Sequence, residues 1–245
     1  MGLVPAITKV ICRPVARSTW VLVDPGSWSS FKAKLAEEAA LILHRCSAIS
    51  FGHFKLTSGL DSPYYIDMRL IPSYPDLFDR ICDIYCEVIR GEVGSFDRIA
   101  GIPTAGVPFA AVVALKLKKP FIYVRKTLRF HGQLKTIEGV LNKGDKVLLV
   151  DDLVSTGDSA LKTIEAIRGQ GGEVTDVVVL IDREQGAEEL LRAASVKLHA
   201  LMKVTEAAKI LLEKGLLSKE GYETILSYVE QGRLRGSLVE AGPGR

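Results

Sequence analysis

The chain has 245 residues, of which 47% are hydrophobic and 25% charged, as in an average soluble globular protein. This composition excludes an intrinsically disordered chain, a collagen and a small disulfide-stabilised scaffold. The net charge of +3, from 32 Lys and Arg against 29 Asp and Glu, is too small for a dedicated nucleic-acid-binding protein.

The sequence favours a cytoplasmic protein. Its longest apolar stretch, residues 99–117, is interrupted by two glycines and two prolines, which is unfavourable for a membrane span. The four cysteines lack CxxC spacing, which favours buried thiols in a reducing cytosol over a zinc site. Residues 1–30 are expected to form an extension of unknown role, compatible with a transit peptide, an added strand or a misplaced start. We expect no membrane and no nucleic acid among the partners.

The first predicted elements are a helix, a hairpin and a second helix. Apolar residues at helical spacing predict an amphipathic helix over residues 31–47. Residues 51–56 and 64–68 are rich in aromatic and β-branched side chains and flank a turn-rich segment, which predicts a β-hairpin. A further helix is expected at about residues 76–90.

From residue 94 onward, apolar strands alternate with helices. The expected strands lie at residues 98–102, 121–124, 146–150, 174–181 and 196–202. Helices are expected to end near residues 117 and 168, and to span residues 187–194, 205–213 and 218–230. Because uniformly apolar strands require a parallel sheet covered on both faces, the sequence predicts an α/β fold with a doubly wound, mostly parallel sheet.

In such a sheet ligands bind beyond the carboxyl ends of the strands, and the most specific signal lies after the strand at 146–150. Two adjacent acids follow this strand, and a hydroxyl-rich turn precedes the next helix. Helix N-termini and hydroxyls bind phosphate, whereas paired carboxylates suit sugar hydroxyls and a divalent cation. The alternative is a capped helix beside two incidental acids. The segment comprises Asp151, Asp152, Leu153, Val154, Ser155, Thr156, Gly157, Asp158 and Ser159.

Two further segments follow other strands of the predicted sheet. Thr104 and Ala105 lie in a turn of small residues that opens a helix, which is either an ordinary tight turn or an anion site. Residues 123–139 carry four basic side chains and no acid before Glu138. This segment is a solvated loop, a nucleic-acid contact, or a cationic loop that closes over a pyrophosphate.

These segments resemble the phosphoribosyltransferase family, and the basic one is similar to the mobile loop of orotate phosphoribosyltransferases. That loop usually reads Arg-Lys-x-x-Lys-x-His-Gly, and the chain matches it at Arg125, Lys126, His131 and Gly132. Arg129 stands where the family usually has lysine. Arginine keeps the positive charge of lysine but cannot release a proton.

Two more segments resemble this family and differ from its purine-specific relatives. Residues 51–67 resemble the family's hood over the base, with Thr57 where many members carry lysine. Residues 182–186 match the family's strand-end Asp-Arg-x-x-Gly motif. The resemblance implies that the contacts to orotate come from Thr57, Tyr65, Ile66, Ser155 and Arg183.

The resemblance implies an enzyme that makes orotidine 5′-monophosphate and pyrophosphate from orotate and phosphoribosyl pyrophosphate (PRPP), in pyrimidine biosynthesis. It further implies a homodimer with shared active sites. Mg²⁺ would be held mainly through PRPP, with Asp151 and Asp152 as candidate ligands. The alternatives are a phosphoribosyltransferase that acts on another base, and a non-catalytic regulator that senses PRPP.

The implied site residues fall into two overlapping groups. Those that bind PRPP are Thr104, Ala105, Arg125, Lys126, Arg129, His131 and residues 151–159. Those with catalytic roles are Lys126, Arg129, His131, Asp151 and Asp152. The expected domain spans residues 31–230, with the hood at 51–70, and residues 231–245 form a C-terminal tail.

Overall fold

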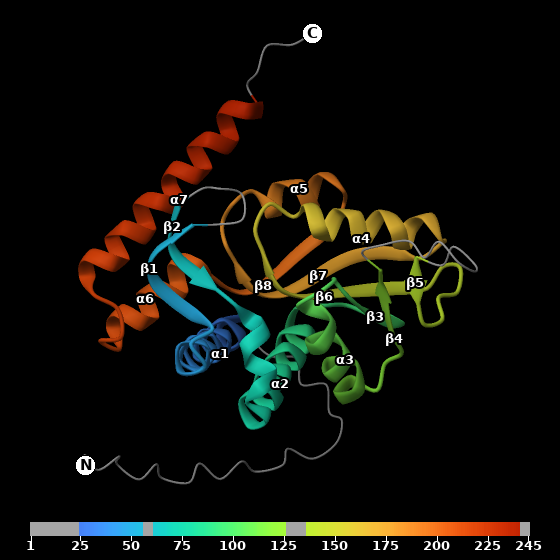
Figure 1. Ribbon diagram of the computed structural model, residues 1–245. Coiled ribbons are helices and arrows are strands. Elements are labelled where there is room, and N and C mark those ends of the chain that lie inside the picture. The colour runs from blue at the N-terminus through green and yellow to red at the C-terminus, as the bar shows by residue number, and fades with distance from the viewer. Residues whose placement is uncertain (1–24, 56–60, 126–135, 241–245) are drawn as a thin grey trace.

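The computed structural model describes residues 25–55, 61–125 and 136–240 of the chain. Six strands form one sheet in the order β5-β4-β3-β6-β7-β8 (Figure 1). All neighbouring pairs are parallel except β4 and β5, which are antiparallel. The strands are β3 (Arg98–Gly101), β4 (Phe121–Val124), β5 (Ile137–Glu138), β6 (Lys146–Val154), β7 (Glu173–Asp182) and β8 (Lys197–Lys203). The predicted mostly parallel sheet is therefore confirmed.

Helices cover both faces of this sheet. Figure 1 shows α4 (Asp158–Gly169) and α5 (Ala187–Ala193) on one face, and α1 (Pro25–Arg45), α2 (Pro75–Glu92) and α3 (Gly106–Leu117) on the other. Alternate residues of β6 enter the two resulting cores: Leu148 and Val150 pack with α1 to α3, whereas Val147 and Leu149 pack with α4 and α5. This two-sided burial explains the uniformly apolar strands of the sequence.

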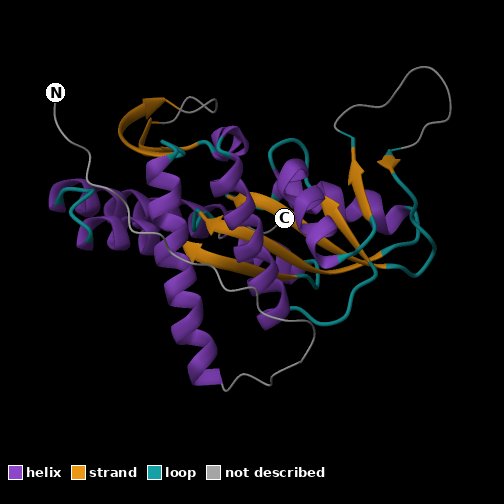
Figure 2. Cartoon of the chain, turned by 90° about the horizontal axis from the view of Figure 1, so that it is seen from below, coloured by secondary structure: helices purple, strands orange, loops and turns teal. Residues whose placement is uncertain are grey.

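A hairpin and two helices complete the described chain. The hairpin pairs β1 (Ile49–Lys55) with β2 (Asp61–Ile66) and stands apart from the six-stranded sheet (Figure 2). A 3₁₀ helix, η1 (Met68–Ser73), leads from it to α2. After β8 come α6 (Val204–Glu213) and α7 (Lys219–Glu240), and α7 runs alongside β2 (Figure 1).

Several predicted boundaries were wrong. β6 continues through residues 151–154 because its ladder with β7 does not end at Val150: Asp151 pairs with Val179, and Val154 with Asp182. The two acids thus belong to the strand and not to the following turn. The two-residue strand β5 was missed because so short an element has no periodicity.

The helices at the ends of the described chain are longer than predicted. α1 begins at Pro25 and not at residue 31, consistent with the preference of proline for the first helical position. Residues 25–30 of the expected extension therefore belong to α1, and residues 1–24 lie outside the described residues. α7 continues to Glu240, ten residues beyond its predicted end at 230, because isolated glycines lower helix propensity without ending a helix. Within the described part of the chain, no helix combines the length and apolar character of a membrane span.

Candidate active site

The strand order places a crevice between β3 and β6. From β3 the chain crosses to β4 on one side, whereas β6, β7 and β8 follow one another on the other side. The crossovers thus diverge at β3 and β6, and such a switch point leaves a crevice beyond the carboxyl ends of these strands. A cavity of about 310 Å³ lies there, lined by residues 103–105 and 151–160. The structure therefore brings together Thr104, Ala105 and the whole acid-and-hydroxyl segment from Asp151 to Ser159.

The two acids of the cleft are held differently. Asp152 is only 8% exposed, and burial raises the pKa of its carboxyl above the ordinary range. The Oδ1 atom of Asp151 accepts a hydrogen bond of 2.9 Å from the backbone N–H of Asp152. From α2, the buried Tyr85 donates its hydroxyl proton to the carbonyl oxygen of Asp151 over 2.7 Å. Because burial also raises the pKa of Tyr85, this hydroxyl stays a donor and supports the strand end that carries both acids.

The turn of small residues lies directly against these acids. A Cβ atom placed on Gly106 would lie 2.4 Å from Oδ1 of Asp151 and 2.8 Å from its Cα. Only glycine allows so close an approach between the start of α3 and the end of β6. The Pro103–Thr104 peptide bond in this turn is cis.

The hydroxyl-rich turn ends at the N-terminus of α4. Gly157 precedes this helix with φ of +92°, a left-handed conformation that favours glycine. The first N–H groups of a helix have no intrahelical acceptor, so the N-terminus of α4 offers donors to an anion in the cleft. Thr156 donates its hydroxyl proton to the carboxylate of Asp158 over 2.7 Å, which orders the turn.

Arg183 connects this turn to the hood. Its backbone N–H donates to the carbonyl oxygen of Val154 over 2.9 Å, which fixes the residue directly after β7. Its Nη1 lies 3.4 Å from Oγ of Ser155, and its Nε lies 3.4 Å from the hydroxyl oxygen of Tyr64. The guanidinium carbon also lies 5.1 Å from the centre of the Tyr64 ring.

Tyr64 was missed by the sequence analysis, which named Tyr65 and Ile66 instead. Tyr64 is fully buried, whereas Tyr65 is 40% exposed and its hydroxyl accepts a hydrogen bond of 3.3 Å from Arg69. Ile66 is half-buried and pairs with Ile49 across the hairpin. Two adjacent tyrosines on a strand point to opposite faces, and a sequence alone does not say which face is inside.

Of the four basic side chains of the segment at 123–139, the described structure contains only Arg125. Arg125 follows β4 and forms an ion pair of 2.8 Å with Glu138 of β5, and its N–H donates to Thr136 over 2.9 Å. These contacts hold β4 and β5 together at the two ends of the basic segment. Arg125 is not among the residues that line the cleft. Lys126, Arg129, His131 and Thr57 lie outside the described residues.

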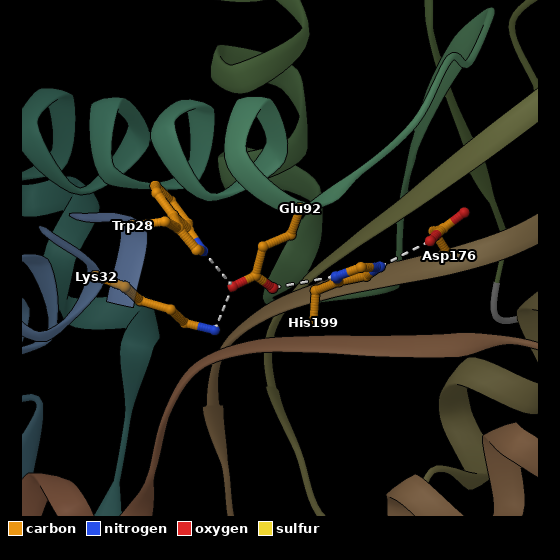
Figure 3. Close-up of polar contacts among 5 residues, drawn as sticks. All are labelled: Trp28, Lys32, Glu92, Asp176 and His199. Carbon is orange, nitrogen blue, oxygen red and sulfur yellow. Dashed lines mark hydrogen bonds and ion pairs between the residues drawn. The ribbon is translucent and has the colours of Figure 1, made fainter. Parts of the chain in front are cut away.

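A larger cavity of about 640 Å³ lies between α1, β8 and α6 and contains none of the predicted site residues. In its wall His199 is 1% exposed and lies 3.1 Å from Glu92 and 2.7 Å from Asp176 (Figure 3). Glu92 also accepts hydrogen bonds from Trp28 over 3.1 Å and from Lys32 over 2.6 Å. Burial raises the pKa of Glu92, but the hydrogen bonds from His199 and Lys32 outweigh it and lower this pKa to about 2. The cluster joins α1 and the end of α2 to the sheet.

Comparisons with known proteins identify relatives across the part of the chain that forms the cleft. A family model described as a phosphoribosyl transferase domain matches residues 74–201. The orotate phosphoribosyltransferase of Sulfolobus acidocaldarius is 39% identical over 178 residues, which cover 73% of this chain and 89% of that protein. The chain belongs to the orotate phosphoribosyltransferase family.

Solved structures of related proteins share the fold. The orotate phosphoribosyltransferase from Aeropyrum pernix is 36% identical with a TM-score of 0.65, and the match covers 73% of this chain and 99% of that one. The UMP synthase of Leishmania donovani is 33% identical with a TM-score of 0.73, over 80% of this chain and 42% of that longer protein. The resemblance inferred from the sequence and the α/β fold class are both confirmed.

Proposed function

We propose that this protein transfers the phosphoribosyl group of PRPP to orotate, giving orotidine 5′-monophosphate and pyrophosphate in pyrimidine biosynthesis. The observation that carries this proposal is the convergence of the paired acids and the small-residue turn on one switch-point cleft, with Arg183 in contact with Ser155 of its wall, in a chain of the orotate phosphoribosyltransferase family. Each of the three groups suits a different part of the two substrates.

The PRPP contacts follow from the chemistry of the cleft walls. Asp151 and Asp152 accept hydrogen bonds from the ribose hydroxyls. The 5′-phosphate binds in the turn from Ser155 to Ser159, where hydroxyls and the N-terminus of α4 supply donors. The pyrophosphate lies against Thr104 and Ala105, whose small neighbours admit it close to the backbone.

The orotate contacts centre on Arg183. A guanidinium recognises a carboxylate through two parallel hydrogen bonds, and orotate differs from uracil by its carboxylate. Ser155 is the first residue of the phosphate turn, its Oγ lies 3.4 Å from Nη1 of Arg183, and it contacts the base from there. Ile66, which lies on the same face of β2 as Tyr64, and Thr57 complete the proposed base site, whereas the side chain of Tyr65 points to the opposite face.

The reaction needs no protein nucleophile. The bond from C1′ of the ribose to N1 of orotate forms as the bond from C1′ to pyrophosphate breaks. The pyrophosphate leaves with the electron pair, and the proton of N1 is released to the leaving pyrophosphate or to water. Positive charge develops at C1′ and negative charge on the leaving group, so positioning and electrostatics supply most of the catalysis. Lys126, Arg129 and His131 neutralise the leaving group from the partner subunit of a homodimer.

Asp151 and Asp152 also fit a role beside Mg²⁺. Among the described residues, no three His, Cys, Asp or Glu side chains gather as a protein-only metal site would require. Two carboxylates suit an ion held mainly by substrate oxygens, as magnesium commonly is. When bound, Mg²⁺ supplies positive charge to the pyrophosphate.

We propose that the protein acts in the cytoplasm.

The decisive experiment follows orotate absorbance in the ultraviolet with PRPP and Mg²⁺. Orotate is consumed only when PRPP is present, and one pyrophosphate appears for each orotate lost. Uracil, adenine and hypoxanthine serve as competing bases, since the charge of Arg183 selects a carboxylate. Turnover of another base without turnover of orotate would contradict the proposal. PRPP binding without turnover of any base would also contradict it, because a non-catalytic regulator would give this result.

A further inference from the structure

The guanidinium of Arg183 packs against one aromatic ring and makes weak hydrogen bonds. Both of its side-chain hydrogen bonds, to Ser155 and to Tyr64, are 3.4 Å long, at the weak end of the range. Among the described residues, no acid forms an ion pair with this guanidinium. The contact with the face of the Tyr64 ring, 5.1 Å from the ring centre, therefore contributes strongly to its direction.

Tyr64 is itself held from two sides. Its carbonyl oxygen accepts a hydrogen bond of 2.7 Å from the hydroxyl of Ser62, which fixes the backbone of β2. Its ring meets Tyr228 of α7 edge to face, with centroids 5.8 Å apart and planes at 89°. Edge-to-face packing fixes both the position and the rotation of the buried ring.

Tyr228 comes from a helix outside the matched domain. That domain covers residues 74–201. Tyr64 of the hood precedes it in the sequence, and Tyr228 of α7 follows it. Among the described residues of α7, the contacts that lead to Arg183 involve only Tyr228, whose ring packs edge to face with that of Tyr64. Tyr228 of this helix thus lies two contacts behind Arg183, the proposed partner of the orotate carboxylate.

We infer that Tyr228 of α7, acting through Tyr64, is a positioning residue that orients Arg183 for the carboxylate of orotate. The inference rests on the proposed function, which assigns this carboxylate to Arg183. It gives α7 a role in substrate selection in addition to its packing role. A positioning residue of this kind affects the affinity for orotate and leaves the PRPP contacts in the cleft unchanged.

The test compares three variants of α7. Tyr228→Ala removes the aromatic edge and is expected to raise the KM for orotate threefold to tenfold, with the KM for PRPP changed less than twofold. Tyr228→Phe keeps the edge and is expected to stay within twofold of the wild type for both. Tyr222→Ala is the matched control, because Tyr222 is also half-buried on α7 and packs against the core, but among the described residues only Tyr228 of α7 has a ring contact with Tyr64. Thermal unfolding is measured first, and Tyr228→Leu replaces the alanine variant if that variant unfolds at the assay temperature.

A double-mutant cycle links Tyr228 to Arg183. If Tyr228 acts through Arg183, then Tyr228→Ala has no further effect on orotate affinity once Arg183→Ala is present. Additive effects would overturn the inference, and so would equal increases in the orotate KM from Tyr222→Ala and Tyr228→Ala. If Arg183→Ala weakens orotate but Tyr228→Ala does not, only the positioning role fails. If Arg183→Ala leaves orotate binding unchanged, the assignment of the base site fails, and this inference with it.

Discussion

Gly106 packs directly against Asp151 in the wall of the cleft, and a side chain at this position would collide with it. Gly106→Ala is therefore the most informative single substitution. Its Cβ would lie 2.4 Å from Oδ1 of Asp151, 2.8 Å from the Cα of Asp151 and 2.9 Å from the carbonyl oxygen of Val150. Two of these three atoms are backbone, which cannot rotate away. Restoring ordinary contact of about 3.5 Å therefore moves the start of α3 and the end of β6 apart by roughly 0.6 to 1 Å.

A displacement of this size separates the two walls that hold PRPP. Misplacement of reacting groups by about 1 Å reduces catalysis by roughly a hundredfold, and overpacking in a core lowers the free energy of unfolding by about 1–3 kcal/mol. We expect kcat/KM to fall by about a hundredfold, with weaker PRPP binding.

Gly94→Ala is the matched control. No atom lies within 4 Å of a Cβ at Gly94, so this variant is expected to keep the activity and stability of the wild type. Steady-state kinetics and urea unfolding measure both quantities in the two variants. If Gly106→Ala keeps kcat/KM within threefold of the wild type, the close contact between the turn and the acids is not needed for the reaction.

Three further predictions concern the support of the acids by Tyr85, the buried cluster around Glu92, and the sharing of active sites in a dimer. Tyr85→Phe removes the hydroxyl that donates to Asp151, and we expect a loss of about 0.5–1.5 kcal/mol in unfolding free energy with a lower kcat; an unchanged kcat would separate Tyr85 from the site. Lowering the pKa of Glu92 from 4.5 to about 2 is equivalent to about 3 kcal/mol, which solvent screening reduces to about 1–2 kcal/mol. Because this pKa is depressed on folding, the stabilisation is complete above pH 4.5 and is lost as the pH falls towards 2. The difference in unfolding free energy between wild type and Glu92→Gln should therefore shrink between pH 6 and pH 3, and a difference independent of pH would refute this. Finally, inactive Lys126→Ala subunits, unfolded and refolded with inactive Asp151→Asn/Asp152→Asn subunits, should regain about a quarter of wild-type activity if the sites are shared; activity no higher than background, in samples with proven heterodimers, would contradict the shared site.

The sequence predicts the sheet well because burial on both faces leaves a strong local signal. Val147 to Val150 are all apolar, and the acids that follow them stand out against this run. The paired acids and the turn around Thr104 were correctly expected at one edge, since parallel strands end on the same side.

The rest of the site depends on contacts that are distant in the sequence. Tyr64 and Tyr228 are far apart in the chain, and only the hairpin register decides that Tyr64, and not Tyr65, faces Arg183. The pairing of His199 with Glu92 likewise joins residues 107 positions apart. Neither contact leaves a periodic or local pattern, so both required the folded structure.

The central claim is that the cleft at the ends of β3 and β6 binds PRPP through its paired acids. The most direct measurement is isothermal titration calorimetry of PRPP, in the presence of Mg²⁺, with the wild type and with the Asp151→Asn/Asp152→Asn double variant. We predict a saturable heat for the wild type and none for the double variant, while circular dichroism shows that the fold persists. PRPP binding of unchanged affinity in the folded double variant would contradict the account.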